Sequence, residues 1–137
     1  MLSLIHIFNP CEFVTDQSNT FLYQSFRNAN AQATEYLEKY KGQNTKVLII
    51  ILGDGAIHDY SECFSLKEDG ASNELITFCS ILFESSDWQE DMDMETVNEL
   101  KLEFSKLAST QADYMSTVDA EKIRSHMIQS ITKISKI

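Results

Sequence analysis

Residues 46–55 read Lys-Val-Leu-Ile-Ile-Ile-Leu-Gly-Asp-Gly. The six apolar residues after Lys46 predict a strand that is buried on both faces of a parallel sheet, because a strand with one face in water would alternate apolar and polar residues. The run stops at Gly53-Asp54-Gly55. A carboxylate at the end of a parallel strand is available for metal coordination or general-base chemistry. The other interpretation is that Asp54 only caps the turn after the strand.

The residues before this strand predict a helix and two earlier strands. Leu2 to Phe8 and Cys11 to Thr15 have the apolar patterns of short strands. From Asn19 onward, apolar residues recur at spacings of three and four, which places them on one face of a helix. These residues are Leu22, Phe26, Ala29, Ala33, Leu37 and Tyr40. We expect Ser18 or Asn19 to cap the start of this helix and Gly42 to provide its left-handed C-terminal cap.

The rest of the chain alternates between helices and strands. A short helix is expected around Ser61 to Lys67 and a buried strand over Leu75 to Phe83. Asp93 then caps a helix, Tyr114 to Thr117 forms a short strand, and Asp119 opens a final helix. The positions expected to face the core are Val97, Leu100, Phe104 and Leu107 in the first of these helices, and Ile123, Met127, Ile131 and Ile134 in the last. This alternation predicts one α/β domain over residues 1–137, a Rossmann-like three-layer sandwich with a mostly parallel central sheet and right-handed crossovers.

The composition of the chain restricts its partners and its compartment. Eleven Lys and Arg against 21 Asp and Glu give a net charge of −10, which disfavours nucleic acid and anionic lipid. No apolar run is long enough to span a membrane, so we expect no membrane insertion. The three cysteines, Cys11, Cys63 and Cys79, lack a CxxC spacing, which favours a reducing, cytoplasmic location. Cys63 and Cys79 are expected to be small apolar core residues.

The order of these elements resembles the von Willebrand factor A (VWA) domain family. In that family an apolar strand ends in Thr-Asp-Gly or a close variant, and an amphipathic helix before it begins just after a loop threonine. Here Thr20 precedes the first helix, and Leu52-Gly53-Asp54-Gly55 ends the strand. The following Ala56-Ile57-His58-Asp59 is similar to the segment found in the copine subgroup. The resemblance covers nearly the whole chain and implies a VWA-like fold.

The resemblance also implies a metal-ion-dependent adhesion site (MIDAS). In the family, Asp-x-Ser-x-Ser on the first strand, a loop threonine and a loop aspartate bind Mg²⁺, and the last two match Thr20 and Asp54 here. The Asp-x-Ser-x-Ser strand has no counterpart, and Gly53 replaces the common threonine. Because Mg²⁺ needs six oxygen ligands in near-octahedral geometry, two side chains hold it weakly. We therefore expect Mg²⁺ binding only when the upstream strand is restored.

The missing first strand makes the predicted fold incomplete. In the family it is central and lies beside the strand matched by Lys46 to Leu52, so its absence exposes the edge of an apolar strand. The sequence is therefore interpreted as a partial VWA-like domain from a longer protein. Residues 2–7 read Leu-Ser-Leu-Ile-His-Ile, which a common sequencing adapter encodes in one frame, so this segment is a candidate cloning scar.

The function expected from these features is a non-enzymatic protein-binding module whose partner supplies an acidic side chain to the metal. An alternative is a fragment of a haloacid-dehalogenase-like phosphatase in which Asp54 and Asp59 hold Mg²⁺, although the required upstream Asp-x-Asp is missing. A third possibility is an interaction domain that needs no ion. His58 is expected in an exposed loop and His126 on the surface of the last helix. No motif indicates catalysis.

Overall fold

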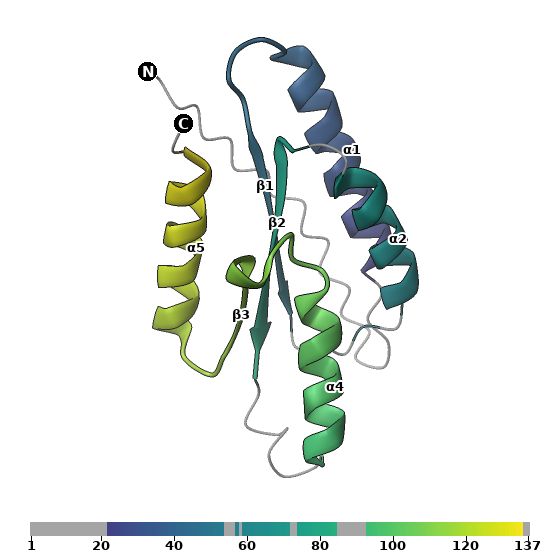
Figure 1. Ribbon diagram of the computed structural model, residues 1–137, viewed down its shortest axis with the longest axis vertical. Helices are drawn as coiled ribbons and strands as arrows, with labels where there is room; N and C mark the ends of the chain where they lie inside the picture. Colours follow the sequence, from purple (N-terminus) through teal and green to yellow (C-terminus); the bar gives the residue numbers. More distant parts are fainter. Residues whose placement is uncertain (1–21, 54–56, 58, 72–73, 85–92, 136–137) are drawn as a thin grey trace.

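The computed structural model describes residues 22–53, 57, 59–71, 74–84 and 93–135 (Figure 1). Within these ranges the chain forms α1 (Tyr23–Lys39), β1 (Val47–Gly53), α2 (Tyr60–Ala71), β2 (Ile76–Phe83), α4 (Met94–Ser105), the 3₁₀ turn η1 (Gln111–Asp113), β3 (Tyr114–Thr117) and α5 (Ala120–Ser135). The alternation of helices and strands confirms the predicted α/β, Rossmann-like class.

The three described strands form a parallel sheet in the order β1-β2-β3. Val47 is opposite Ile76 and Gly53 opposite Leu82, whereas Ser80 is opposite Tyr114 and Phe83 opposite Thr117. Because the strands are parallel, Gly53, Phe83 and Thr117 end at the same edge of the sheet, which we call the carboxyl edge. Among the described strands, β1 pairs only with β2.

Helices lie on both faces of this sheet. Figure 1 shows α1, α2 and α4 on one side and α5 on the other. The main hydrophobic core is on the first side, where Phe26 and Leu37 of α1 and Phe104 of α4 pack against Ile49, Phe78 and their neighbours. Phe26 and Phe78 are in direct ring contact, with centroids 5.3 Å apart. The main core therefore lies on the first face, while Leu48, Ile50 and Ile81 are on the second face, which α5 covers.

Several predicted details of the helices are confirmed. Phe26, Ala33 and Leu37 of the α1 stripe are buried, and Gly42 has a φ of +86°, the left-handed conformation predicted after this helix. The Asp93 carboxylate accepts a hydrogen bond from Thr96 N at 2.8 Å and so caps α4. Asp119 accepts from Glu121 N at the start of α5. Ser18, Asn19 and the two predicted N-terminal strands lie outside the described residues.

The two longer strands differ in burial more than their sequences suggest. Seven of the eight residues of β2 are buried or half-buried, and Cys79, Ile81 and Leu82 are inaccessible to solvent. In β1 only Ile49 and Ile51 are buried, and Leu52 is 56% exposed. The prediction of complete burial on both faces was therefore right for β2 and wrong for β1, because β1 is the outer strand of the described sheet.

Candidate functional site

The two predicted metal ligands, Thr20 and Asp54, lie outside the described residues, as does His58. The residues next to them are described: Leu22 follows Thr20 by two positions and Gly53 immediately precedes Asp54. The geometry of the candidate site is therefore given by its flanks, at the beginning of α1 and at the carboxyl edge of β1.

Asp59 joins these two flanks. One of its carboxylate oxygens accepts a hydrogen bond from Leu22 N and the other from Tyr23 N, each at 2.8 Å. These amides belong to the first turn of α1, whose N–H groups have no acceptor within the helix. Leu22, at the N-cap position, makes no side-chain capping bond, so Asp59 takes the role of the cap from 36 and 37 residues away. The negative carboxylate also suits the positive end of the helix dipole.

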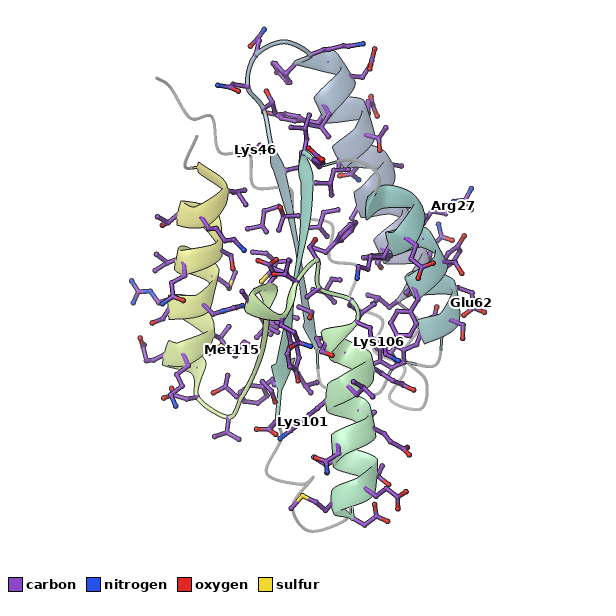
Figure 2. The ribbon with its side chains drawn as sticks, viewed as in Figure 1. Arg27, Lys46, Glu62, Lys101, Lys106 and Met115 are labelled. Atoms are coloured by element: carbon purple, nitrogen blue, oxygen red, sulfur yellow. The ribbon has the colours of Figure 1, made fainter. Side chains whose placement is uncertain are left out.

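The carboxyl edge carries apolar side chains and one ion pair. Leu52, Phe83 and Val118, at or just beyond the ends of β1, β2 and β3, are all exposed. Glu84, which follows β2, forms an ion pair with Lys101 of α4 at 2.6 Å. Figure 2 labels Lys101 near this edge. It also labels Lys46, which immediately precedes β1 and so lies at the opposite edge of the sheet. Among the described residues, the carboxyl edge therefore combines exposed apolar side chains with the Glu84–Lys101 ion pair.

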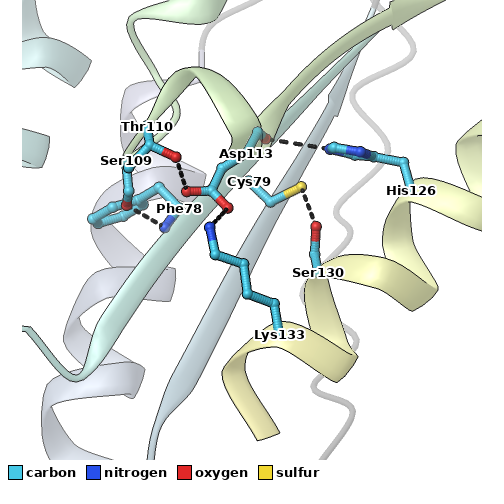
Figure 3. Close-up of polar contacts among 8 residues, drawn as sticks. All are labelled: Phe78, Cys79, Ser109, Thr110, Asp113, His126, Ser130 and Lys133. Atoms are coloured by element: carbon cyan, nitrogen blue, oxygen red, sulfur yellow. Dashed lines mark hydrogen bonds and ion pairs between the residues drawn. The ribbon is translucent and has the colours of Figure 1, made fainter. Parts of the chain in front are cut away.

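A second polar cluster lies between the sheet and α5 (Figure 3). Asp113, only 2% exposed, accepts a hydrogen bond from Thr110 Oγ1 at 2.7 Å and is ion-paired with Lys133 Nζ at 3.2 Å. His126 Nε2 lies 3.4 Å from the backbone carbonyl oxygen of Asp113. Asp113 thus takes part in three bonds that involve side chains, those of Thr110, His126 and Lys133, and the last two come from α5.

The same cluster corrects the predicted exposure of His126 in α5. His126, expected on the surface, is only 8% exposed, and Ser130 is buried beside it. The positions expected to face the core, Ile123, Met127, Ile131 and Ile134, are half-buried, whereas the described positions on the other side of the helix are exposed. The predicted inward face is therefore right but wider than expected, because His126 and Ser130 at the same side of the helix find polar partners in Asp113 and Cys79.

Cys63 and Cys79 are buried free thiols, as predicted. Burial and the nearby negative charges of Asp59 and Glu62 raise the pKa of Cys63 to about 12. Burial also raises the pKa of Cys79, whose Sγ lies 3.5 Å from Ser130 Oγ. Because the thiolate is the nucleophilic form, neither thiol is activated for catalysis.

Among the described residues, no group of three or more His, Cys, Asp or Glu side chains is arranged to hold a metal ion. In the same ranges of the chain, no helix has the length and apolar character needed to cross a membrane.

Two polar residues that organise this region were not identified in these roles from the sequence. Asp59 was considered only as a phosphatase metal ligand, and Asp113 was not singled out. Both form hydrogen bonds or ion pairs with residues at least 13 positions away. The bond between Asp113 and Thr110 is the local exception. Side-chain capping signals are local, so a cap supplied from across the fold has no sequence signature.

Comparison of the chain with family models, with curated proteins and with solved structures finds no match. The VWA resemblance therefore stays a prediction, based on the order of the elements and the residues quoted for it.

Proposed function

We propose that this chain is a non-enzymatic, VWA-type protein-binding module. Its metal site is incomplete, with Thr20 and Asp54 as the Mg²⁺ ligands that the chain itself supplies. The observation that supports this proposal is the bidentate contact of Asp59 with Leu22 N and Tyr23 N. That contact joins Asp59, five positions after Asp54 in the sequence, to the beginning of α1, which Thr20 precedes in the sequence.

The proposed chemistry follows from the charge and the ligand count. A threonine hydroxyl and one carboxylate leave most of the Mg²⁺ coordination sphere to water. An acidic side chain of a partner protein replaces one of these waters and adds the charge that the site lacks. The Asp-x-Ser-x-Ser strand, when present upstream, adds three more oxygen ligands and pairs with the outer edge of β1.

Mg²⁺ titration by calorimetry tests this proposal. The 137-residue chain is expected to bind Mg²⁺ poorly, and a longer form with an Asp-x-Ser-x-Ser strand upstream is expected to bind it well. Asp54→Ala in the longer form removes this binding, whereas the matched control Asp93→Ala, which changes an exposed carboxylate at the start of α4, preserves it. Unchanged binding after Asp54→Ala would contradict the proposal.

The phosphatase alternative is less well supported because of Asp59. Both oxygens of Asp59 accept backbone amides of α1, so one lone pair on each is already used to hold the start of the helix. Hydrolysis of p-nitrophenyl phosphate in the presence of Mg²⁺ discriminates between the two. The binding-module proposal predicts no turnover, and turnover that disappears in Asp59→Asn would favour the phosphatase.

A further inference from the structure

The outer edge of β1 presents backbone groups that no described residue pairs. Val47 N donates a hydrogen bond to Leu75 O at 2.8 Å, so the N–H of Val47 points toward β2. Successive residues of a strand direct their N–H and C=O groups to alternate sides, and the register of β1 with β2 is regular. The N–H and C=O groups of Leu48, Ile50 and Leu52 therefore point away from β2, and we call them the outer groups of β1.

The outer groups of β1 favour pairing with a further strand. Leu48 and Ile50 are half-buried, and a backbone N–H or C=O that is shielded from water without a partner costs about as much free energy as a lost hydrogen bond. Within the described ranges, β1 pairs only with β2. An apolar edge strand of this kind also pairs readily with other chains. We therefore expect a strand of the chain itself to cover this edge.

The start of α1 shows in which direction such a strand runs. Asp59, between the end of β1 and the start of α2, holds the N–H groups of Leu22 and Tyr23, so α1 begins at the carboxyl edge of the sheet. The helix then leads through residues 40–46 to the other end of β1. A strand that a short loop joins to α1 therefore ends at the carboxyl edge and runs parallel to β1.

The described crossovers show on which side of β1 this strand lies. The connections β1-α2-β2 and β2-α4-β3 both carry their helix on the first face, and both step across the sheet in the direction from β1 to β3 (Figure 1). About 98% of crossovers between parallel strands share one hand. Because α1 lies on the same face, a crossover through α1 steps in the same direction. The strand before α1 is therefore beside β1, on the side away from β2.

Residues 11–15 fit this position. They read Cys-Glu-Phe-Val-Thr, the strand-like segment nearest to α1, and they lie outside the described residues. Six residues, 16–21, separate them from Leu22, and loops from a strand to a helix in α/β units have about 2–6 residues. Residues 2–8, the other strand-like segment, are separated from Leu22 by 13 residues, 9–21, so they fit this connection less well.

We propose that residues 11–15 pair in parallel with the outer groups of β1 and close this edge of the sheet. The closed edge then resists pairing with a second copy of the chain. The inference concerns the 137-residue chain and does not depend on the proposed metal site. In the longer form considered above, the Asp-x-Ser-x-Ser strand takes this edge instead. Mg²⁺ titration of that form and the experiment below therefore fail independently.

The alternation of residues 11–15 agrees with the two faces at this edge. On the first face, α1 packs over Ile49 and Ile51 of β1. On the second face, Leu52 is 56% exposed. Because the side chains of a strand alternate between faces, Phe13 faces α1 when Glu12 faces the second, more open face. This arrangement buries the aromatic ring and leaves the carboxylate in water.

Solution NMR of the 137-residue chain tests the pairing. We expect nuclear Overhauser contacts in a parallel pattern between residues 11–15 and 48–52. The three N–H groups among the outer groups of β1 should exchange with solvent deuterium at least about a hundredfold more slowly than in an unfolded peptide. Fast exchange, an antiparallel pattern or contacts from residues 2–8 instead would overturn the proposal. Protection that depends on protein concentration would assign the edge to a second copy and would also overturn it.

A pair of proline variants sharpens this test. Proline has no N–H, and of two neighbouring residues in a strand only one directs its N–H at β1. The double variant Val14→Pro with Thr15→Pro therefore removes a bond in either register, and it should accelerate exchange at the outer groups of β1 at least about tenfold. The amide of Ile81, in the buried strand β2, should stay protected.

The matched control places the same two prolines in residues 2–8, as Leu4→Pro with Ile5→Pro. This variant should leave the exchange of the outer groups of β1 unchanged. Equal acceleration by the two double variants, or none by Val14→Pro with Thr15→Pro, would overturn the proposal. Where the first double variant does not fold, the contacts measured in the unaltered chain decide.

Discussion

Asp59 is the residue on which the arrangement of the candidate site depends most directly. Its two hydrogen bonds satisfy backbone N–H groups that would otherwise lack a partner at the start of α1. Removal of the Asp59 carboxylate leaves the part-buried N–H groups of Leu22 and Tyr23 without their acceptor. The substitution thus removes the contact between the residues after β1 and the start of α1.

We predict that Asp59→Ala lowers the free energy of unfolding by about 2 kcal/mol, from the loss of a cap and of a second hydrogen bond. Asp93→Ala, which removes a single exposed cap from α4, is the comparison and should cost less. Urea denaturation followed by circular dichroism measures both. A smaller loss for Asp59→Ala than for Asp93→Ala would show that Asp59 does not anchor α1.

Asp93 gives a prediction about pH. The hydrogen bond from Thr96 N holds the pKa of the Asp93 carboxyl below its ordinary value of 3.8. A carboxyl whose pKa is lower in the folded protein binds fewer protons there than in the unfolded chain, so its contribution is present above about pH 4 and is lost as the pH falls through the lowered pKa. The stability advantage of the wild type over Asp93→Asn should therefore shrink between pH 6 and pH 3. An advantage that stays constant over this range would contradict the assignment.

Among the elements, β1 and β2 have similar apolar sequences but differ in how deeply their side chains are buried. Leu82 of β2 is inaccessible to solvent and belongs to the main core, whereas Leu52 of β1 is 56% exposed at the carboxyl edge. We predict that Leu82→Ala costs about 3 kcal/mol of unfolding free energy and Leu52→Ala about 0.5 kcal/mol or less. The two substitutions remove the same atoms, so the difference between their urea midpoints measures burial alone. Similar losses would mean that Leu52 is covered in solution.

For the molecule as a whole, the net charge of −10 is the dominant electrostatic feature. Self-repulsion of this charge opposes the compact state, and salt screens it. We predict that the urea midpoint rises when NaCl is raised from about 20 mM to about 500 mM. Replacement of the exposed acids Glu35 and Glu38 of α1 by glutamine should reduce this dependence. A midpoint that falls with salt would mean that attractive ion pairs outweigh the repulsion.

The sequence alone determined the α/β class, the positions of β1, β2 and β3 and the helical stripe of α1. These features depend on local hydrophobic periodicity, which differs between a buried strand and an amphipathic helix. The caps at Asp93 and Asp119 were also predictable, because a capping side chain acts on amides two or three residues away.

Only the tertiary structure decided how Asp59, Asp113 and His126 are used. Their partners are 13 to 37 residues distant, and a hydrogen bond across the fold leaves no periodic trace in the sequence. The exposure of β1 was decided in the same way, since the burial of a strand depends on the neighbours that the fold gives it and not only on its own residues.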